Sequence, residues 1–426
     1  MTKVIAGIVP GARQRSRSAL RFGYFVKPHM GGTFTLFSHL RKGLAAHGIE
    51  VEWIALDDAG VGFVPGPDGD AGAFVACAST DDRVRAAAMM DALARRRYDG
   101  VFVNVLADRR DMNLARYLPA HLTRIMIVHN ITPGTYAAAR AIREHVHATV
   151  GVSERCRRDL VAAHGFDAKR TVAIPNAVDV EAVTMRARPP RRLGDGLRLL
   201  YLGRIEDASK GVFWLPDILS RTTEPMTLTV AGDGPDLAKL KARMTRFGDR
   251  MRFAGSVAQA DVPDLLLAHD VMIMPSRFEG FGLTIVEAMA AGCVPVVSHL
   301  AGVTETIVQN GVTGLLFPVG ERGIAAACID ELARDPVLLE AMSVRSRERA
   351  RRCFGLEQMA DSYAALMRDV VARKPVVPAA LPLSQWAYPS GLRTGLRTYL
   401  PQNVKNWLRG ARERVQPRSD EIRRRA

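Results

Sequence analysis

Long hydrophobic runs and paired cysteine motifs are both missing from this chain of 426 residues. No apolar stretch approaches the length that spans a bilayer, and the apolar run at residues 4–9 is too short for a signal peptide. The five cysteines are scattered without C-x-x-C or histidine-spaced pairs, which argues against a disulfide framework and a zinc site. We therefore expect a cytoplasmic protein that does not cross a membrane by itself.

Several catalytic fingerprints are also absent. The chain has no Walker-type phosphate loop, no G-x-S-x-G elbow and no repeat array. The pair Asp68 and Asp70 has an Asp-x-Asp form that can hold a divalent cation, but it lies in a Pro/Gly-rich stretch. We interpret it as an ordinary solvated loop and expect no bound metal.

The net charge of +15 is distributed unevenly. Residues 373–426 hold twelve Lys and Arg against three acids, which gives +9. Trp386, Tyr388 and Trp407 are interleaved with these basic residues, a combination found at lipid headgroup interfaces. Residues 384–426 are therefore a candidate contact for an anionic membrane on the inner face, with a docked terminal helix or a disordered tail as alternatives.

Short apolar runs alternate with helical patterns along most of the chain, which predicts parallel βαβ units. They form two series, and the Pro- and Arg-rich residues 186–196 separate the series as a linker would. The fold class is therefore α/β, with two doubly wound domains. The expected strands are residues 20–26, 51–56, 100–106, 124–128, 148–152 and 170–174 in the first domain, and 197–202, 226–231, 251–253, 271–274, 294–297 and 315–317 in the second.

The domain boundaries follow from these patterns. We expect a flexible extension at 1–19, a first domain at 20–185, the linker at 186–196 and a second domain at 197–355. A helical pattern at 356–371 is followed by clustered prolines. A helix over 356–373 and a basic tail over 374–426 complete the division.

The most informative stretch follows the predicted strand at 271–274. It places Glu279 in a glycine-rich turn and Glu287 eight positions later, inside an apolar helix. A helix N-terminus at the carboxyl end of a parallel strand suits an anion. A carboxylate near phosphate oxygens needs another task, such as accepting hydrogen bonds from sugar hydroxyls. The stretch therefore indicates a phosphorylated sugar or nucleotide as ligand, rather than glutamates placed only for solubility.

Other polar residues are expected at the carboxyl edges of the two sheets. Arg204 and Lys210 follow the first strand of the second domain and together suit a diphosphate, although such residues in loops are often merely solvated. Gly31 and Gly32 follow the first strand of the first domain, where close backbone approach to a ligand or a simple turn would both fit. His129 ends another strand, either in the cleft or as a cap.

Taken together, these motifs resemble the retaining nucleotide-sugar glycosyltransferases of family 4, which have two facing Rossmann-like domains, the GT-B fold. The similarity covers roughly residues 20–367 and is densest over 202–317, where residues 203–204, 210–211, 232–235, 275–287 and 310–314 carry it. The resemblance implies transfer of a sugar from a UDP- or GDP-sugar to a carbohydrate or lipid-linked hydroxyl, with retention and without a metal. It also implies a role in polysaccharide or glycoconjugate biosynthesis.

The resemblance also implies roles for single residues. Glu279 and His129 would contact the donor sugar, Glu287 the ribose, and Arg204 with Lys210 the diphosphate. The remaining implied donor contacts are the backbone N–H groups of Phe281, Gly282 and Leu283, the phosphate contact Gly32, and Ser256 with Val257 near the base. The chain departs from the family pattern at Ala177 and Ala301, where glycine is common and an alanine restricts the backbone.

Three other functions compete with this interpretation. A GT-B relative that epimerises or phosphorolyses sugars would use a similar donor site. A catalytically silent binding protein has little support, because all the polar candidates are present. Nucleic-acid binding would suit the net charge, but the chain has no recognition motif for it and its excess charge lies at the ends. We expect no nucleic-acid partner.

Overall fold

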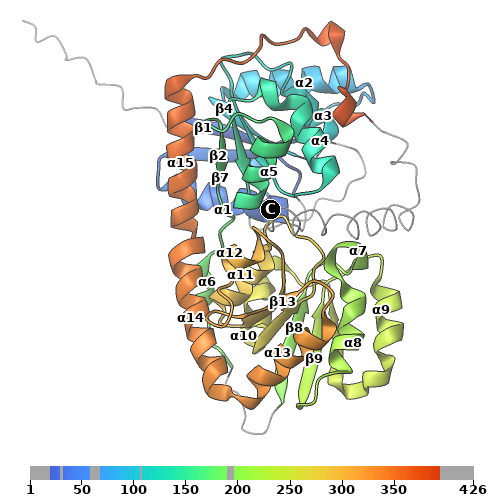
Figure 1. The fold of residues 1–426 in the computed structure, drawn as a ribbon. Helices are drawn as coiled ribbons and strands as arrows, with labels where there is room; N and C mark the ends of the chain where they lie inside the picture. The colour runs from blue at the N-terminus through green and yellow to red at the C-terminus, as the bar shows by residue number, and fades with distance from the viewer. Residues whose placement is uncertain (1–19, 29–31, 58–67, 106–107, 190–195, 394–426) are drawn as a thin grey trace, which may run out of the picture.

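The structure, a computed structural model, describes residues 20–28, 32–57, 68–105, 108–189 and 196–393 (Figure 1). Within these residues the chain forms two parallel β-sheets, one above the other in Figure 1, and helices flank each sheet. Strands and helices alternate along the chain, as parallel βαβ units require. The predicted α/β class with two doubly wound domains is confirmed.

The first sheet has the strand order β3-β2-β1-β4-β5-β6-β7. Its strands are β1 (Leu20–Phe25), β2 (Ile49–Leu56), β3 (Gly72–Val75), β4 (Gly100–Asn104), β5 (Thr123–Val128), β6 (Ala148–Gly151) and β7 (Thr171–Ala173). The chain order reverses between the neighbours β1 and β4, so the loops after these strands diverge and leave a crevice at the carboxyl edge of the sheet.

The second sheet repeats this arrangement with the order β10-β9-β8-β11-β12-β13. Its strands are β8 (Leu197–Leu202), β9 (Met226–Ala231), β10 (Met251–Gly255), β11 (Val271–Met274), β12 (Val294–His299) and β13 (Leu315–Pro318). Here the order reverses between β8 and β11. All four residues of β11 are buried, as expected of a central strand covered on both faces.

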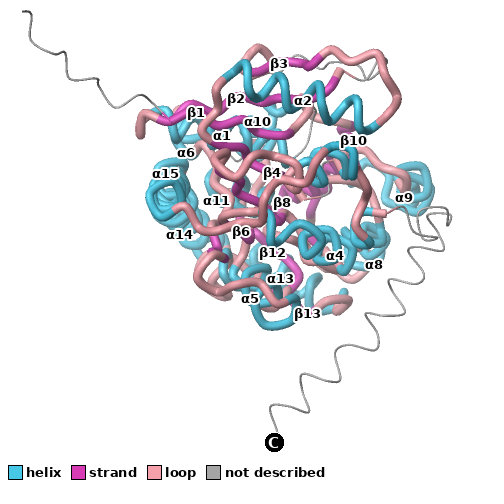
Figure 2. The backbone as a smooth tube through the Cα atoms, turned by 90° about the horizontal axis from the view of Figure 1, so that it is seen from above, coloured by secondary structure: helices cyan, strands magenta, loops and turns pink. Residues whose placement is uncertain are grey.

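Helices cover both sheets, and in Figure 2 they lie around the strands. The first domain has α1 (Gly32–Ala45), α2 (Asp82–Arg96), α3 (Arg109–Leu114), α4 (Pro133–Ile142) and α5 (Glu154–His164). The later helices are α6 (Val180–Thr184), α7 (Asp207–Lys210), α8 (Leu215–Leu219), α9 (Leu237–Met244), α10 (Val262–Leu267), α11 (Leu283–Ala290), α12 (Thr304–Ile307), α13 (Arg322–Arg334), α14 (Pro336–Phe354) and α15 (Leu356–Arg373). In the described part of the chain, no helix has the length and apolar character that crossing a membrane requires.

The strand β3 is one that the sequence pattern does not predict. It has only four residues, lies at the edge of its sheet and follows a Pro/Gly-rich stretch, so its apolar signal is weak. The expected strand at 100–106 is also shorter than predicted and ends at Asn104. That end places the Asn104 side chain at the carboxyl edge of the sheet.

The two domains are joined at adjacent crossings of the chain. The N–H of Val178, on the way into the second domain, donates to the carbonyl of Phe354, on the way back, at 2.9 Å. Beyond Gly355 the helix α15 packs along α1, and α14 and α15 lie at the same side of the molecule (Figure 1, Figure 2). One buried apolar cluster includes Phe102 of β4, Tyr363 of α15 and Phe281 beside α11, so it extends through both domains.

The first part of the predicted basic tail, after α15, packs against the first domain. We call residues 374–393 the strap. Its N–H at Leu381 donates to the carbonyl of Arg116 at 3.0 Å, and Leu392 is buried against the helices of the first domain. In Figure 1 the strap, coloured orange to red, passes over the first domain from α15 toward α3 and α4.

Aromatic residues hold the strap in place. The rings of Trp386 and Tyr117 lie 4.6 Å apart, and the Tyr388 hydroxyl donates to Asp82 at 2.6 Å. The Tyr117 hydroxyl also donates to the Gln385 carbonyl at 3.0 Å. Trp386 and Tyr388, proposed above as membrane contacts, therefore have partners within the protein. Residues 394–426 of the membrane prediction, with Trp407, lie outside the described residues.

We expect Trp386→Ala to lower the free energy of unfolding by about 1–3 kcal/mol, because it removes aromatic packing against Tyr117. Val376→Ala is the matched control, since Val376 lies on the same strap and is 89% exposed. Urea denaturation, followed by far-UV circular dichroism because it does not depend on the substituted tryptophan, measures the stability of both variants. Equal stability of the two variants would contradict the packed strap.

Candidate active site

A glycine brings the loops after β8 and β11 into contact. The short helix α7 ends at Lys210, and the next residue, Gly211, has a left-handed φ of 60°. A Cβ on Gly211 would lie 2.2 Å from the carbonyl oxygen of Pro275, so only glycine fits without displacement. This contact places Lys210 directly beside the loop that carries Glu279.

Lys210 and Glu279 form an ion pair at the centre of these loops. The Lys210 ammonium lies 2.5 Å from Oε1 of Glu279, and the Ser276 hydroxyl donates to the same oxygen at 2.7 Å. Glu279 is 8% exposed and the Lys210 side chain 24%, so solvent screens the pair only in part. Among the described residues no donor reaches Oε2, and this oxygen is not closed off from solvent. Oε2 is therefore the atom of Glu279 that can meet a ligand.

Arg277 fixes the geometry of the same two loops, and the sequence analysis missed it. Its guanidinium donates to the Asp207 carboxylate and to the Asp207 carbonyl, both at 2.9 Å. It also lies 3.9 Å from the ring centre of Trp214, a cation–π distance. Arg277 thus ties the β11 loop to α7 and the turn after it. In the sequence, the one signal for this role was that Arg277 lies within the stretch 275–287.

The helix α11 presents a free N-terminus to this region. Gly282 is its N-cap, with a left-handed φ of 102° and no side-chain cap. The first N–H groups of a helix have no partner within the helix, so those near Phe281, Gly282 and Leu283 can bind an anion. Phe281 is buried, and its ring packs against Phe354 at 6.0 Å. That packing holds the loop in place.

Glu287 lies about one turn into α11 and is partly buried. Gln259, on the neighbouring segment before α10, donates to its Oε1 at 3.2 Å. Burial raises the pKa of the Glu287 carboxyl above its ordinary value, and the bond from Gln259 opposes this rise. The carboxylate therefore has one amide donor and no cation as partner among the described residues.

The other predicted residues of the second domain lie on exposed loops. Arg204 is exposed, and no residue of the described part hydrogen-bonds its side chain. Ser256 is exposed and Val257 partly buried, just after the end of β10. A Cβ on Gly232 would lie 1.9 Å from the Gly203 carbonyl oxygen, so the loops after β8 and β9 are in backbone contact. The structure groups Lys210 with Glu279 and leaves Arg204 and Ser256 without described contacts to them.

The first domain contributes His129 to the same region. A Cβ on Gly280 would lie 2.0 Å from the carbonyl oxygen of His129, so the two domains meet in backbone contact beside Glu279. The His129 ring hydrogen-bonds Asn104 at 2.7 Å, and burial lowers its pKa to about 4. His129 is therefore neutral near pH 7. Asn104 is a second residue that the sequence analysis missed.

Gly32 lies at the first position of α1 and is exposed. A Cβ there would meet nothing within 4 Å of the described residues, so there is open space beside Gly32. Gly31, the other glycine of the pair, lies outside the described residues. The predicted phosphate contact of Gly32 stays a prediction.

A second contact joins the domains at Ala301, one of the two positions where the chain has alanine and the family commonly has glycine. The Arg155 guanidinium donates to the Ala301 carbonyl at 3.2 Å, and the Arg155 N–H donates to the Gly302 carbonyl at 3.4 Å. Gly302 has the left-handed φ of 76°, whereas Ala301 and Ala177 are not among the residues with positive φ. Neither alanine therefore strains the backbone.

Asp68 takes part in an ion pair away from this region. Its carboxylate lies 3.1 Å from the Arg41 guanidinium of α1, and its carbonyl accepts from the Trp53 indole. Within the described ranges, no three His, Cys, Asp or Glu residues are grouped so that they could bind a metal. These contacts give Asp68 a structural role.

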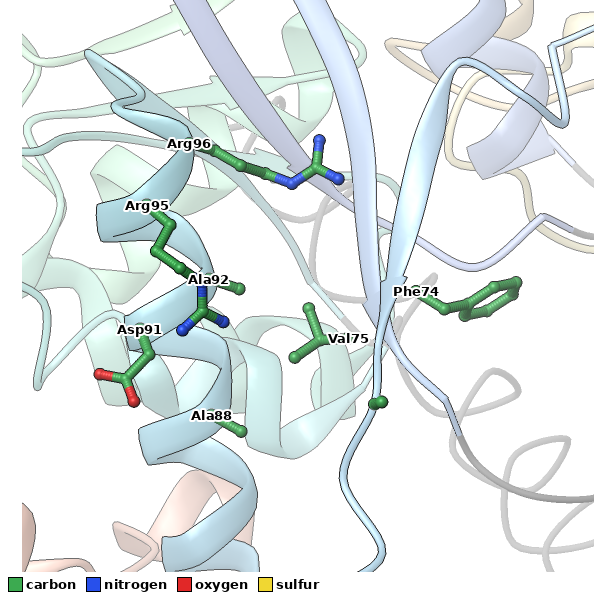
Figure 3. A pocket seen from close by; sticks show the side chains of 8 residues that line it. Phe74, Val75, Ala88, Asp91, Ala92, Arg95 and Arg96 are labelled. Atoms are coloured by element: carbon green, nitrogen blue, oxygen red, sulfur yellow. The ribbon is translucent and has the colours of Figure 1, made fainter.

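A hollow of about 380 Å³ lies at the edge of the first sheet, between β3 and α2 (Figure 3). Val75, Ala88 and Ala92 form its apolar part, while Asp91 and Arg95 lie on α2 and the Phe74 ring points away from them. None of the predicted site residues lines this hollow.

Two family profiles match the chain. The profile described as Glycosyltransferase Family 4 matches residues 30–182, in the first domain. The profile described as Glycosyl transferases group 1 matches residues 196–335, in the second. Together they include every strand of the two sheets except β1. Of the candidate site residues, Gly32 and His129 lie in the first match and the others in the second.

Characterised relatives match part of the chain. The phosphatidyl-myo-inositol mannosyltransferase of Mycobacterium tuberculosis is 32% identical over 194 residues, which are 45% of this chain and 50% of that protein. The alpha-D-kanosaminyltransferase of Streptomyces kanamyceticus is 27% identical over 270 residues, 60% of this chain and 69% of that protein. The chain thus spans about half the length of the mannosyltransferase that it matches.

Solved structures share the fold over a larger part of the chain. HepE from Anabaena, solved with UDP and glucose, superposes with a TM-score of 0.67 and 18% identity over 82% of this chain and 100% of that chain. The sucrose-phosphate synthase from Thermosynechococcus elongatus gives 0.69 and 18%, over 83% of this chain and 100% of that chain. With two matching profiles and this architecture, the chain belongs to the family 4 glycosyltransferases of the GT-B fold.

Proposed function

We propose that this chain transfers a sugar from a nucleotide diphosphate sugar to a hydroxyl of a carbohydrate or lipid-linked acceptor, with retention of configuration. The observation that carries the proposal is the partly buried Lys210–Glu279 pair, which lies beside the open N-terminus of α11 and beside His129 of the facing domain. A cation, helix N–H groups and a carboxylate are the groups that a sugar diphosphate needs within one site.

The named relatives support the substrate classes. A neighbour of the same fold was solved with UDP and glucose, and a sequence relative is a phosphatidyl-myo-inositol mannosyltransferase. We accordingly propose a UDP- or GDP-sugar as donor and place the chain in glycoconjugate or polysaccharide biosynthesis. Membrane contact through residues 384–426 stays a prediction. Because Trp386 and Tyr388 have partners within the protein, we propose residues 394–426 as the part that makes this contact.

The site suits a displacement in which the acceptor attacks on the face that the diphosphate leaves. The acceptor oxygen forms a bond to the anomeric carbon, the bond from that carbon to the diphosphate oxygen breaks, and the acceptor proton passes to a phosphate oxygen. Lys210, the N–H groups of α11 and the exposed guanidinium of Arg204 stabilise the charge that grows on the leaving diphosphate. Oε2 of Glu279 accepts a hydrogen bond from the sugar.

A panel of nucleotide sugars with purified protein tests this proposal. Thermal stabilisation by one donor and slow release of its nucleoside diphosphate identify the base and the sugar, and proton NMR of the glycoside made from an α-linked donor gives the anomeric configuration. A β-linked product would contradict retention. A new sugar nucleotide or a sugar phosphate, instead of a glycoside, would favour the epimerase or phosphorylase alternative.

We expect Lys210→Ala to reduce the transfer rate about 10²–10³-fold, because the leaving diphosphate loses a cation and Glu279 loses its partner. Lys239→Ala is the matched control, since Lys239 is an exposed lysine on α9 of the same domain. Steady-state kinetics with thermal melts of both variants separates loss of chemistry from loss of folding. Equal rates for the two folded variants would remove Lys210 from the site.

Glu287→Gln should have opposite effects on stability and on binding. A carboxyl whose pKa is raised on folding destabilises the folded state above its ordinary pKa, and this cost vanishes as the pH falls below that value. The variant should therefore raise the Tm of the ligand-free protein by about 1–3 °C near neutral pH and less in acid. It should weaken donor binding about 10-fold, because an amide is a poorer acceptor for ribose hydroxyls.

Calorimetric melting at two pH values and titration with the donor measure both effects of Glu287→Gln. Glu357→Gln, at an exposed glutamate in the first turn of α15, is the control and should change neither quantity. A loss of Tm near neutral pH in Glu287→Gln would show that the carboxylate stabilises the ligand-free fold, against the direction of its pKa.

We also propose that the reaction needs no metal, since Lys210 and Arg204 supply the positive charge for the diphosphate. Turnover should be unchanged, within a factor of about two, by an excess of EDTA, because charge-assisted bonds replace a cation bridge. Restoration of a lost activity by Mg²⁺ or Mn²⁺ after chelation would contradict this.

A further inference from the structure

A line of hydrogen bonds crosses the carboxyl ends of three neighbouring strands, β1, β4 and β5. The Asn104 side-chain NH₂ donates to the carbonyl oxygen of Phe25 at 3.0 Å. On its other side, Oδ1 of Asn104 lies 2.7 Å from Nε2 of His129. Asn104 is 2% exposed, so the protein alone determines its orientation.

These contacts fix where the proton of His129 resides. A backbone carbonyl only accepts, so the NH₂ group of Asn104 must face Phe25 and its oxygen must face His129. That oxygen also only accepts, so Nε2 of His129 carries the proton and donates it to Asn104. In the neutral ring the other nitrogen, Nδ1, then has a free lone pair.

The lone pair on Nδ1 remains available to a ligand. Nδ1 has no partner among the described residues, and it is not one of the side-chain atoms closed off from solvent. Burial keeps the pKa of the ring at about 4, so near neutral pH no proton occupies Nδ1. His129 can therefore accept a hydrogen bond at Nδ1 and cannot donate one there.

Because His129 lies beside the candidate site, the direction of its hydrogen bond affects which nucleotide sugar can bind. The backbone of His129 touches Gly280, the residue after Glu279, so His129 lies at the domain contact beside the Lys210–Glu279 pair. A sugar hydroxyl donates readily to an imidazole nitrogen. A carboxylate has no proton to donate and would place its negative charge against the lone pair, so it cannot form this hydrogen bond.

We propose that Asn104 is a positioning residue that holds His129 as a hydrogen-bond acceptor at Nδ1, so that the site selects a donor sugar with a free hydroxyl there and disfavours a uronate. This inference rests on the proposed transfer from a nucleotide sugar. It adds that the sugar donates a hydrogen bond to Nδ1 of His129 and that Asn104 sets this direction. It also adds that neutral hexosyl donors are the preferred class of sugar donor.

The tautomer is measurable without any substrate. In the full chain labelled with ¹⁵N-histidine, long-range proton–nitrogen NMR should show a protonated Nε2 and an unprotonated Nδ1 for His129, assigned by the spectrum of His129→Gln. Asn104→Ala should give a mixture of the two tautomers, because nothing then holds the proton on Nε2. A proton on Nδ1, or a mixture, in the unaltered chain would overturn the proposal.

Asn113→Ala is the matched control for Asn104→Ala. Asn113 is also fully buried in the first domain, and its NH₂ group donates to the Ala387 carbonyl of the strap at 3.4 Å. Its loss should cost stability and leave the His129 tautomer unchanged. If Asn104→Ala does not fold, the spectrum of the unaltered chain and the donor series below still decide the question.

Deoxyfluoro analogues of the accepted nucleotide sugar test the selection. A fluorine cannot donate a hydrogen bond, so replacing one particular hydroxyl should weaken binding about 10-fold in the unaltered chain and much less in His129→Gln. In Asn104→Ala the same discrimination should shrink, with KM rising more than kcat falls. The uronate analogue should bind less tightly than the parent donor.

The outcomes separate the two proposals. Tight binding of every analogue, with normal turnover of the parent sugar, would refute the role of His129 and leave the transferase proposal intact. Failure of all nucleotide sugars to bind a folded protein would refute the transferase proposal and with it the sugar selection, while the NMR result would still report on Asn104 and His129.

Discussion

The ion pair between Lys210 and the buried Glu279 is the interaction on which the arrangement of the site depends. It joins the loops after β8 and β11, the two strands between which the order of the second sheet reverses. Removing a partner from such a pair leaves a buried charge without compensation, which is strongly destabilising. The pair therefore requires both loops to stay close. Arg277 secures the same closeness through Asp207 and Trp214.

The backbones around the Lys210–Glu279 pair are in close contact. Such contact leaves no room for a Cβ, which explains why glycines recur there. Gly211 lies against Pro275, and Gly280 lies against His129 of the other domain. At each position a Cβ would lie within 2.2 Å of a carbonyl oxygen. The first contact aligns Lys210 with Glu279, and the second brings that pair against the first domain. The site thus depends on residues with no side chain as much as on charged ones.

Much of the fold was predictable from the sequence because it depends on local patterns. Apolar runs of strand length marked most strands of both sheets, since parallel strands are buried on both faces. The edge strand β3 had too short a run to stand out. The sequence left the role of the strap open, because Trp386 and Tyr388 among arginines fit a lipid interface and a packed surface equally well. Composition alone does not distinguish these two environments.

The sequence by itself determined the two-domain α/β architecture and the candidates Glu279, Glu287 and Lys210, because spacing and residue type carry that information. The tertiary structure decided which side chains meet. The pairing of Lys210 with Glu279 spans 69 positions, and the bond from His129 to Asn104 spans 25. Both exist only because strand order brings distant chain segments to one sheet edge. Hydrogen-bond direction at His129 likewise follows from neighbours that no local pattern reveals.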